Sequence, residues 1–116
     1  MRNPDLASNR ETALEFLSRF CAGDVEGLAP LLARDLRFRG PLLESESYSE
    51  YLDSLRSDPP ERCLYTVLSV TEDPDSVSIY YDCEKADGTV RIAQLFKFSN
   101  KQISELILVF DTGKFG

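Results

Sequence analysis

Residues 90–111, VRIAQLFKFSNKQISELILVFD, decide the fold because they place two alternating segments on either side of a turn. Apolar residues recur at every second position of the first segment, which is the period of a half-buried β-strand. Asn100-Lys101 is the turn signal, so the two segments are expected to form an antiparallel hairpin. Gln94 falls on the apolar face. A buried amide without a partner costs about 1–3 kcal/mol, so Gln94 is expected to bond either a ligand or a core side chain.

The second segment of this hairpin can face the core in two ways. A two-residue turn at Asn100-Lys101 would pair Phe98 with Ile103. The face of Gln94 would then be shared by Glu105, Ile107, Val109 and Asp111. One bulged residue would reverse the alternation and put Leu106, Leu108 and Phe110 on that face instead. The residues alone leave both solutions open.

The strand pattern extends over the whole second half of the chain. Residues 62–110 are expected to hold four strands, separated by turns at Asp73-Pro74-Asp75, Asp87-Gly88 and Asn100-Lys101. A two-residue Asp87-Gly88 turn would pair Tyr81 with Gln94 on the apolar face. The same register would pair Glu84 with Arg91 as an ion pair on the opposite face.

The first half carries helix signals instead. Ser8-Asn9-Arg10-Glu11 and Ser47-Tyr48-Ser49-Glu50 are typical of capping boxes, which begin helices. Gly23 is a natural end for the first helix. Asp24 is expected to cap a short second helix, which Pro30 must kink or shorten because proline lacks the backbone N–H. Three helices followed by antiparallel strands predict an α+β fold with the helices on one face of a curved sheet.

The first strand is expected at residues 34–41, RDLRFRGP, between the second and third helices. Leu36, Phe38 and Gly40 share one face of it. Arg37 and Arg39 lie on the other face, where they can pair with the protein's own glutamates or with a partner subunit.

Composition limits the kind of function. The net charge of −7 disfavours nucleic acid and anionic membranes as partners, since both need a basic surface. Histidine is absent, which excludes Ser-His and Cys-His nucleophile pairs. No apolar run approaches the roughly 20 residues of a membrane span, and the N-terminus lacks the apolar region of a signal peptide, so a cytoplasmic protein is expected.

The cysteines predict neither a disulfide framework nor a metal centre. They are three, an odd number, and the positions of Cys21, Cys63 and Cys83 are widely spaced. We expect small core residues, with Cys63 and Cys83 as cross-strand neighbours. The chain has neither a recognisable metal-ligand spacing nor a phosphate-binding glycine loop, so neither a metal nor a cofactor is expected.

Three stretches together resemble the nuclear-transport-factor-2-like superfamily, closest to its SnoaL-like and ketosteroid-isomerase-like branches. They are AGDVEGLAPLLARDLRFRGP at residues 22–41, the short helix before Pro59-Pro60, and AQLFKFSNKQISELILVFD at residues 93–111. The resemblance implies one domain over residues 1–116. It further implies a cone, a cystatin-like α+β barrel, in which a mixed sheet of about six strands encloses an apolar pocket. Many members dimerise through the outer sheet face, and their activities differ widely, so the fold does not fix the function.

The positions that matter in the ketosteroid isomerases are altered in this chain. The general-base aspartate of those enzymes falls at Gly40, their oxyanion tyrosine at Phe16, and their second oxyanion acid at Gln94. Isomerase activity of that kind is therefore not expected. The resemblance leaves Asp111 as a candidate carboxylate, since the related cyclases use an aspartate late in the fold, and Glu105 is a second candidate.

The leading hypothesis is a small-molecule-binding protein with an apolar pocket for a hydrophobic or cyclic metabolite. The expected ligand-binding residues are Gln94, Tyr81, Phe16, Phe20, Phe38, Phe96 and Tyr51. The alternative is an isomerase, dehydratase or cyclase with Asp111 or Glu105 as the acid/base, and Gln94 or Tyr81 as the donor to an oxyanion. A third hypothesis is a non-catalytic module that dimerises through the sheet face.

Overall fold

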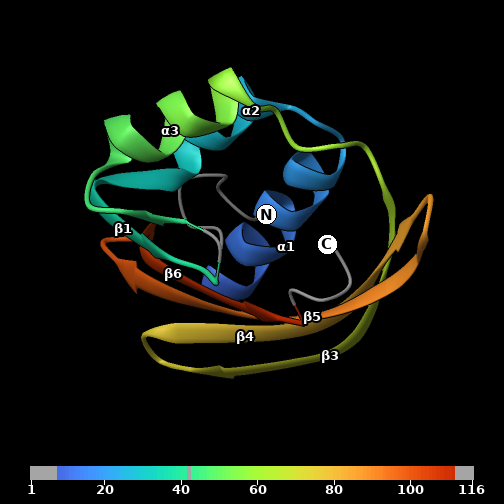
Figure 1. Cartoon of the computed structure of the whole chain (residues 1–116). Coiled ribbons are helices and arrows are strands. Elements are labelled where there is room, and N and C mark those ends of the chain that lie inside the picture. The colour runs from blue at the N-terminus through green and yellow to red at the C-terminus, as the bar shows by residue number, and fades with distance from the viewer. Residues whose placement is uncertain (1–7, 42, 112–116) are drawn as a thin grey trace.

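Three helices lie in the concave side of a six-stranded sheet, as the computed structural model of residues 8–41 and 43–111 shows (Figure 1). The helical elements are α1 (Asn9–Cys21), α2 (Val25–Leu28), the short 3-10 helix η2 (Ala29–Leu31) and α3 (Tyr48–Ser57). The strands are β1 (Leu32–Arg39), β2 (Glu44–Ser45), β3 (Leu64–Asp73), β4 (Ser76–Lys85), β5 (Gly88–Ser99) and β6 (Gln102–Phe110). The α+β prediction is confirmed.

The sheet is mixed and open. Its strand order is β2-β1-β6-β5-β4-β3, in which β1 runs parallel to β6 and every other pair is antiparallel. β2 and β3 are edges, so the sheet does not close into a barrel. The two-residue strand β2 was not expected from the sequence, because a segment so short has no alternation to detect.

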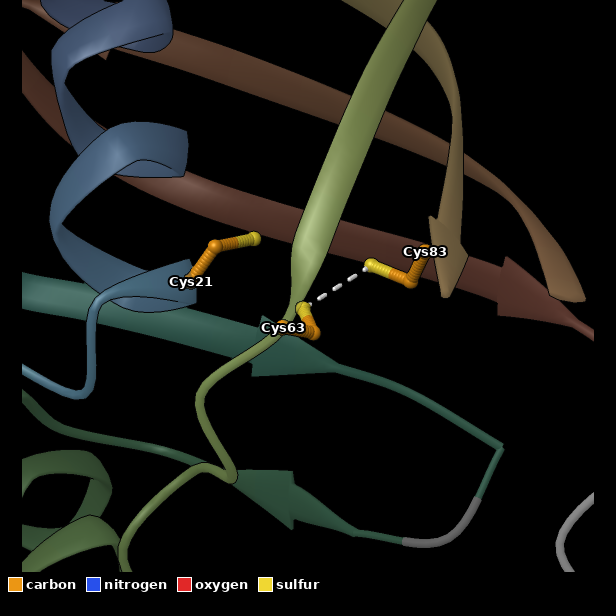
Figure 2. A group of neighbouring side chains, drawn as sticks. All are labelled: Cys21, Cys63 and Cys83. Atoms are coloured by element: carbon orange, nitrogen blue, oxygen red, sulfur yellow. Dashed lines mark hydrogen bonds between the residues drawn. The ribbon is translucent and has the colours of Figure 1, made fainter. Parts of the chain in front are cut away.

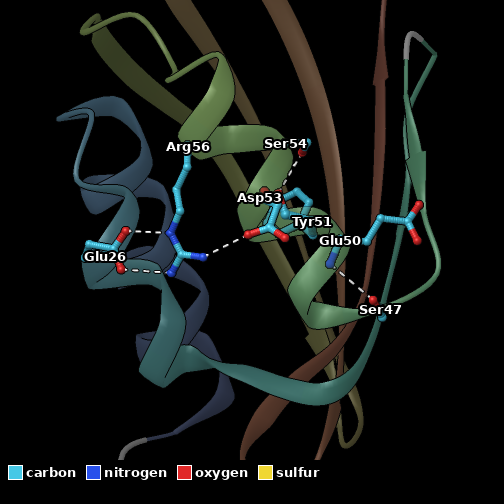
Figure 3. Close-up of polar contacts among 7 residues, drawn as sticks. All are labelled: Glu26, Ser47, Glu50, Tyr51, Asp53, Ser54 and Arg56. Carbon is cyan, nitrogen blue, oxygen red and sulfur yellow. Dashed lines mark hydrogen bonds and ion pairs between the residues drawn. The ribbon is translucent and has the colours of Figure 1, made fainter.

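Local side-chain chemistry fixes the start of α1 and α3. The Ser8 hydroxyl accepts from the Glu11 N–H at 3.1 Å and the Glu11 carboxylate accepts from the Ser8 N–H, so the first capping box is complete. At α3 only one half forms. Ser47 accepts from the Glu50 N–H at 3.1 Å, while the Glu50 side chain points away from Ser47 (Figure 3). The prediction of a full second box was wrong.

The link between α1 and β1 follows the predicted signals. Gly23 has φ +76°, a left-handed conformation that suits glycine and ends α1. The Asp24 carboxylate accepts from the Gly27 N–H at 3.0 Å and begins α2. Pro30 lies in η2, so α2 stops after a single turn.

The β4–β5 hairpin closes one residue earlier than predicted. Lys85 pairs with Gly88, which makes Ala86 and Asp87 the turn residues and not Asp87-Gly88. A type I′ turn would need positive φ at both central residues, and here only Gly88 has it, at +131°. The register therefore moves by two residues, which keeps every side chain on its predicted face.

This shift changes the partners across the two strands. Tyr81 lies opposite Ile92, and Ile79 lies opposite Gln94. The ion pair on the outer face joins Arg91 to Asp82, with N–O distances of 2.9 and 3.2 Å. The predicted pair between Glu84 and Arg91 was wrong.

A bulge in β6 decides between the two facings of the last strand. Phe98 pairs with Ile103 as expected from the Asn100-Lys101 turn, but Lys97 pairs with Glu105, so Ser104 is the extra residue. Without the bulge, Glu105 would lie opposite Phe96 in the core, where an unpaired carboxylate is costly. With it, Leu106, Leu108 and Phe110 face inward and lie opposite Phe96, Gln94 and Ile92.

The main core fills the space between α1 and the concave face of the sheet. Its largest fully buried side chains include Phe16, Phe96, Leu17, Leu28, Leu36, Leu52, Ile79, Ile103 and Leu106. The rings of Phe16 and Phe96 meet edge to face with centroids 5.5 Å apart. This packing closes one end of the cone and leaves the other end for a cavity.

Candidate ligand cavity

A cavity of about 200 Å³ lies between α1, α3 and the inner face of the sheet. It is lined by Phe20, Phe38, Gly40, Pro41, Leu43, Tyr51, Leu55, Tyr81, Gln94, Leu108 and Phe110. Pro41 and Leu43 are exposed, which places the mouth at the segment after β1. A hollow of about 440 Å³ near Arg34 and Asn100 is larger, but it is lined mainly by polar groups.

Gln94 and Tyr81 form the polar centre of this apolar cavity. The Tyr81 hydroxyl donates to the Gln94 side-chain oxygen at 2.8 Å, and both residues are buried. They are diagonal neighbours across β4 and β5, a spacing that long side chains can bridge. Among the residues described, no protein group bonds the Gln94 NH₂, so its two N–H donors are available to a ligand.

Tyr51 supplies a second polar group from the helical side. Its ring packs against Phe38, with centroids 4.9 Å apart. Within the described part of the chain the Tyr51 hydroxyl has no hydrogen-bond partner. Burial raises the pKa of Tyr51 and of Tyr81 above the ordinary tyrosine value of 10.0, so both remain neutral phenols at physiological pH.

An ion-pair group on the surface holds α3 in place over the cavity. The Arg56 guanidinium contacts Glu26 of α2 at 2.8 and 3.0 Å and Asp53 of α3 at 3.1 Å (Figure 3). The hydrogen bonds from Arg56 lower the pKa of Glu26. Because Tyr51 lies on the same helix, this link helps to position its ring.

Five of the seven predicted ligand-binding residues line the cavity: Gln94, Tyr81, Phe20, Phe38 and Tyr51. Phe16 and Phe96 do not, because they pack against each other in the core behind it. Leu55, Pro41, Leu43 and Gly40 also line the cavity, although no sequence pattern marked them as ligand contacts. A Cβ on Gly40 would lie 2.9 Å from the Phe38 ring, so this position has little room for a side chain.

The two candidate carboxylates lie elsewhere. Glu105 is on the outer face of the sheet, 3.9 Å from Lys97. Asp111 is exposed beside a hollow that Asp82 and Arg91 also line. Neither lines the cavity, and among the residues described no charged side chain does. Among the described residues, the lining therefore offers phenol and amide groups but no carboxylate, an arrangement that suits an uncharged molecule.

The backbone resembles several solved structures. A nuclear-transport-factor-2-like protein of unknown function from Cytophaga hutchinsonii matches with a TM-score of 0.81 at 20% identity, over 99% of this chain and 98% of that one. A protein from Kribbella flavida, provisionally named a ketosteroid isomerase, matches with a TM-score of 0.77 at 18% identity, over 89% and 77%. A protein from Jannaschia, provisionally named a SnoaL-like polyketide cyclase, matches with 0.74 at 18%, over 96% and 90%.

These similarities establish the fold that the sequence resemblance implied, the nuclear-transport-factor-2-like cone. No family model and no curated protein matches the sequence. Within the described residues, no helix has the length and apolar character required to cross a bilayer. Identities of 20% and below carry no activity from those proteins to this chain.

Proposed function

We propose that this protein binds a small, uncharged and mostly apolar molecule that carries a hydrogen-bond acceptor. The observation that carries the proposal is the Gln94 amide, which is buried in an apolar cavity. Its oxygen accepts from Tyr81, and its N–H donors have no partner among the described residues. A neutral ketone, ester or ether oxygen would satisfy those donors. A binding site of this kind, apolar with a few convergent polar groups, is the common form of ligand pockets.

The size of the cavity narrows the ligand class. About 200 Å³ is more than the roughly 150 Å³ that holds benzene in an engineered apolar cavity. It is less than the roughly 300–1,000 Å³ typical of sites for drug-sized ligands. A molecule with one or two rings is therefore the best match.

A titration with three matched naphthalenes tests this proposal. Methyl naphthyl ketone is neutral and carries an acceptor, ethylnaphthalene is neutral without one, and naphthoate is an anion. We expect the ketone to bind best and ethylnaphthalene about two- to tenfold more weakly, because it leaves the Gln94 donors unpaired. Naphthoate should bind at least ~100-fold more weakly, because its carboxylate would be buried without a counter-charge. Equal binding of all three would contradict the proposal.

The enzymatic alternative has less support. It requires a pocket carboxylate, and Asp111 and Glu105 both lie outside the cavity lining. An acid/base role for either residue stays a prediction without geometric support. Cytoplasmic location and a single domain over residues 1–116 likewise stay proposals. A reducing compartment would keep the three cysteines as the free thiols seen in the structure.

The outer sheet face fits a second copy of the chain. Tyr80, Ala93 and Val109 lie side by side across β4, β5 and β6, and Tyr80 and Val109 are 53% and 60% exposed. Leu95 and Ile107 continue this apolar row. A row of this kind can meet its own copy across a two-fold axis, as most homodimers do. We therefore propose a homodimer through this face.

Light scattering after size-exclusion chromatography tests the dimer. The unaltered chain should elute as a dimer, and Val109→Lys should elute as a monomer, because the substitution buries a lysine charge in the apolar row. Leu64→Lys is the matched control, since Leu64 is also largely exposed, at 73%, but lies on the edge strand β3. A monomeric unaltered chain at high concentration would contradict this proposal.

A further inference from the structure

The three cysteines, far apart in the sequence, converge at one place in the fold. Cys21 ends α1, Cys63 directly precedes β3, and Cys83 lies in β4 (Figure 2). Their sulfur atoms all lie within 4.8 Å of one another, and the Cys63 and Cys83 sulfurs are 3.5 Å apart. The approach of Cys63 to Cys83 was expected from the strand pattern, although Cys83 lies directly opposite Tyr65. That Cys21 joins them was not expected, because α1 meets the β3–β4 hairpin only in the folded chain.

Backbone contacts hold the cluster in place. The Cys63 N–H donates to the Cys21 carbonyl at 3.0 Å, which fixes the entry to β3 against the end of α1. The residues next to these two cysteines are also linked, because the Arg62 side chain donates to the Ala22 carbonyl at 3.0 Å. Cys83 is held by the sheet ladder opposite Tyr65. The three sulfurs therefore come from segments whose positions are already set by the fold.

The dimensions of the cluster match those of a thiolate metal site. Zinc–sulfur bonds of roughly 2.3 Å in a tetrahedral site put the sulfurs about 3.8 Å apart. The distances seen, 3.5 Å for one pair and at most 4.8 Å for the others, are close to this value. Small rotations of the side chains would be enough to complete such a site. A disulfide would use only two of the three sulfurs, and it would leave the third without a role.

One thiol of the cluster is partly accessible. Cys21 and Cys83 are each 4% exposed, whereas Cys63 is half-buried and is the most exposed of the three. The positive charge of Lys85, which also pairs with Glu61 at 3.9 Å, favours the thiolate forms of Cys63 and Cys83. Soft thiolate sulfur prefers Cu⁺ and Zn²⁺ to the hard cations Mg²⁺ and Ca²⁺.

We propose that Cys21, Cys63 and Cys83 together bind one soft metal ion, of the class of Cu⁺ and Zn²⁺. The fourth position of the ion lies on the side of Cys63, where water or a small ligand can reach it. None of the three cysteines lines the cavity described above. The proposed metal site can therefore be tested independently of the proposed ligand binding.

The test uses Cd²⁺ as a soft probe ion with the full, reduced chain, in which all three thiols are first shown to be free. Binding should produce the ultraviolet thiolate-to-metal charge-transfer band and saturate at one ion per chain. Cys63→Ser should lower the affinity at least tenfold. Because Cys63 is half-buried, this variant is expected to keep the fold, which circular dichroism checks. Cys21→Ala and Cys83→Ala should have effects of similar size.

Two further measurements test whether all three sulfurs bind the ion. X-ray absorption should count three sulfur neighbours around the bound ion, and bound Cd²⁺ should protect all three thiols from alkylation. Zn²⁺ in large excess should compete with the probe ion for the site. Any of three results would overturn the proposal. Binding could saturate well below one ion per chain, Cys63→Ser could leave the affinity unchanged, or the bound ion could have two sulfur neighbours or fewer.

Discussion

Replacing Leu108 with tryptophan is expected to lower the affinity for methyl naphthyl ketone at least ~100-fold, because a blocked pocket forfeits most of the binding free energy. Leu108 lines the cavity directly opposite Gln94 in the β5–β6 ladder. An indole at this position would occupy much of a space of about 200 Å³ and cover the amide donors. Isothermal titration of the variant against the unaltered chain measures the loss.

Ile107→Trp is the control for this experiment. Ile107 is the neighbour of Leu108 in β6 and is likewise half-buried, but the bulge at Ser104 turns it to the outer face. Its replacement should leave the affinity for the ketone within about twofold of the original, a difference well below 1 kcal/mol. Loss of binding in Ile107→Trp with retention in Leu108→Trp would show that β6 faces the other way. Both the bulge and the cavity lining would then be wrong.

Phe96→Ala is expected to destabilise the protein by about 3–5 kcal/mol, the usual cost of removing a buried phenylalanine ring. Phe96 is fully buried between Val77 and Leu106, and its ring meets that of Phe16 edge to face. The cost contains the lost burial, the lost ring contact and the space left behind. Urea unfolding followed by circular dichroism measures it from the shift in midpoint.

Leu95→Ala is the matched control on the same strand. Leu95 precedes Phe96, is half-buried and faces the outer side of the sheet. Measured at a chain concentration low enough to keep the protein monomeric, its loss should cost less than about 1.5 kcal/mol, since little volume buried within the single chain is removed. Equal effects of the two substitutions would contradict the packing described here. The pair also tests whether Phe96 belongs to the core behind the cavity, outside its lining.

Features fixed by neighbouring residues could be read from the sequence. The Ser8 capping box, the end of α1 at Gly23 and the break at Pro30 each depend on side-chain and backbone chemistry within a few residues. Strand faces were predicted correctly for β4 and β5, because alternation survives a register shift of two residues. Gln94 was recognised because a single amide interrupts that alternation.

Features that depend on tertiary contacts could not be predicted from the sequence pattern. The bulge at Ser104 depends on the balance between burying Glu105 and burying Leu106, and both solutions satisfy the local pattern. Pairing of β4 with β5 depends on which residues form the turn, and Asp87-Gly88 is a strong signal that the structure does not follow. The strand pattern predicted that Cys63 and Cys83 lie close together, but it could not predict that Cys21 of α1 joins them.

The lining of the candidate cavity could be predicted from the sequence only in part. Aromatic residues on predicted inner faces were correctly placed in the lining at Phe20, Phe38 and Tyr51. Phe16 is also aromatic and also points inward. Its ring packs against the rings of Phe20 and Phe96, however, so it lies in the core and not in the cavity wall. Only the packing of complete side chains separates a cavity wall from the core behind it.

The central claim is that a neutral ligand binds inside the cone against Gln94. Nuclear magnetic resonance of methyl and side-chain amide groups during titration with methyl naphthyl ketone tests it most directly. We expect the resonances of the Gln94 side-chain amide and the Leu108 methyl groups to shift with one common binding curve, while those of the Val109 methyl groups on the outer face do not move. Shifts confined to Val109 and Tyr80, with Gln94 and Leu108 unchanged, would contradict it.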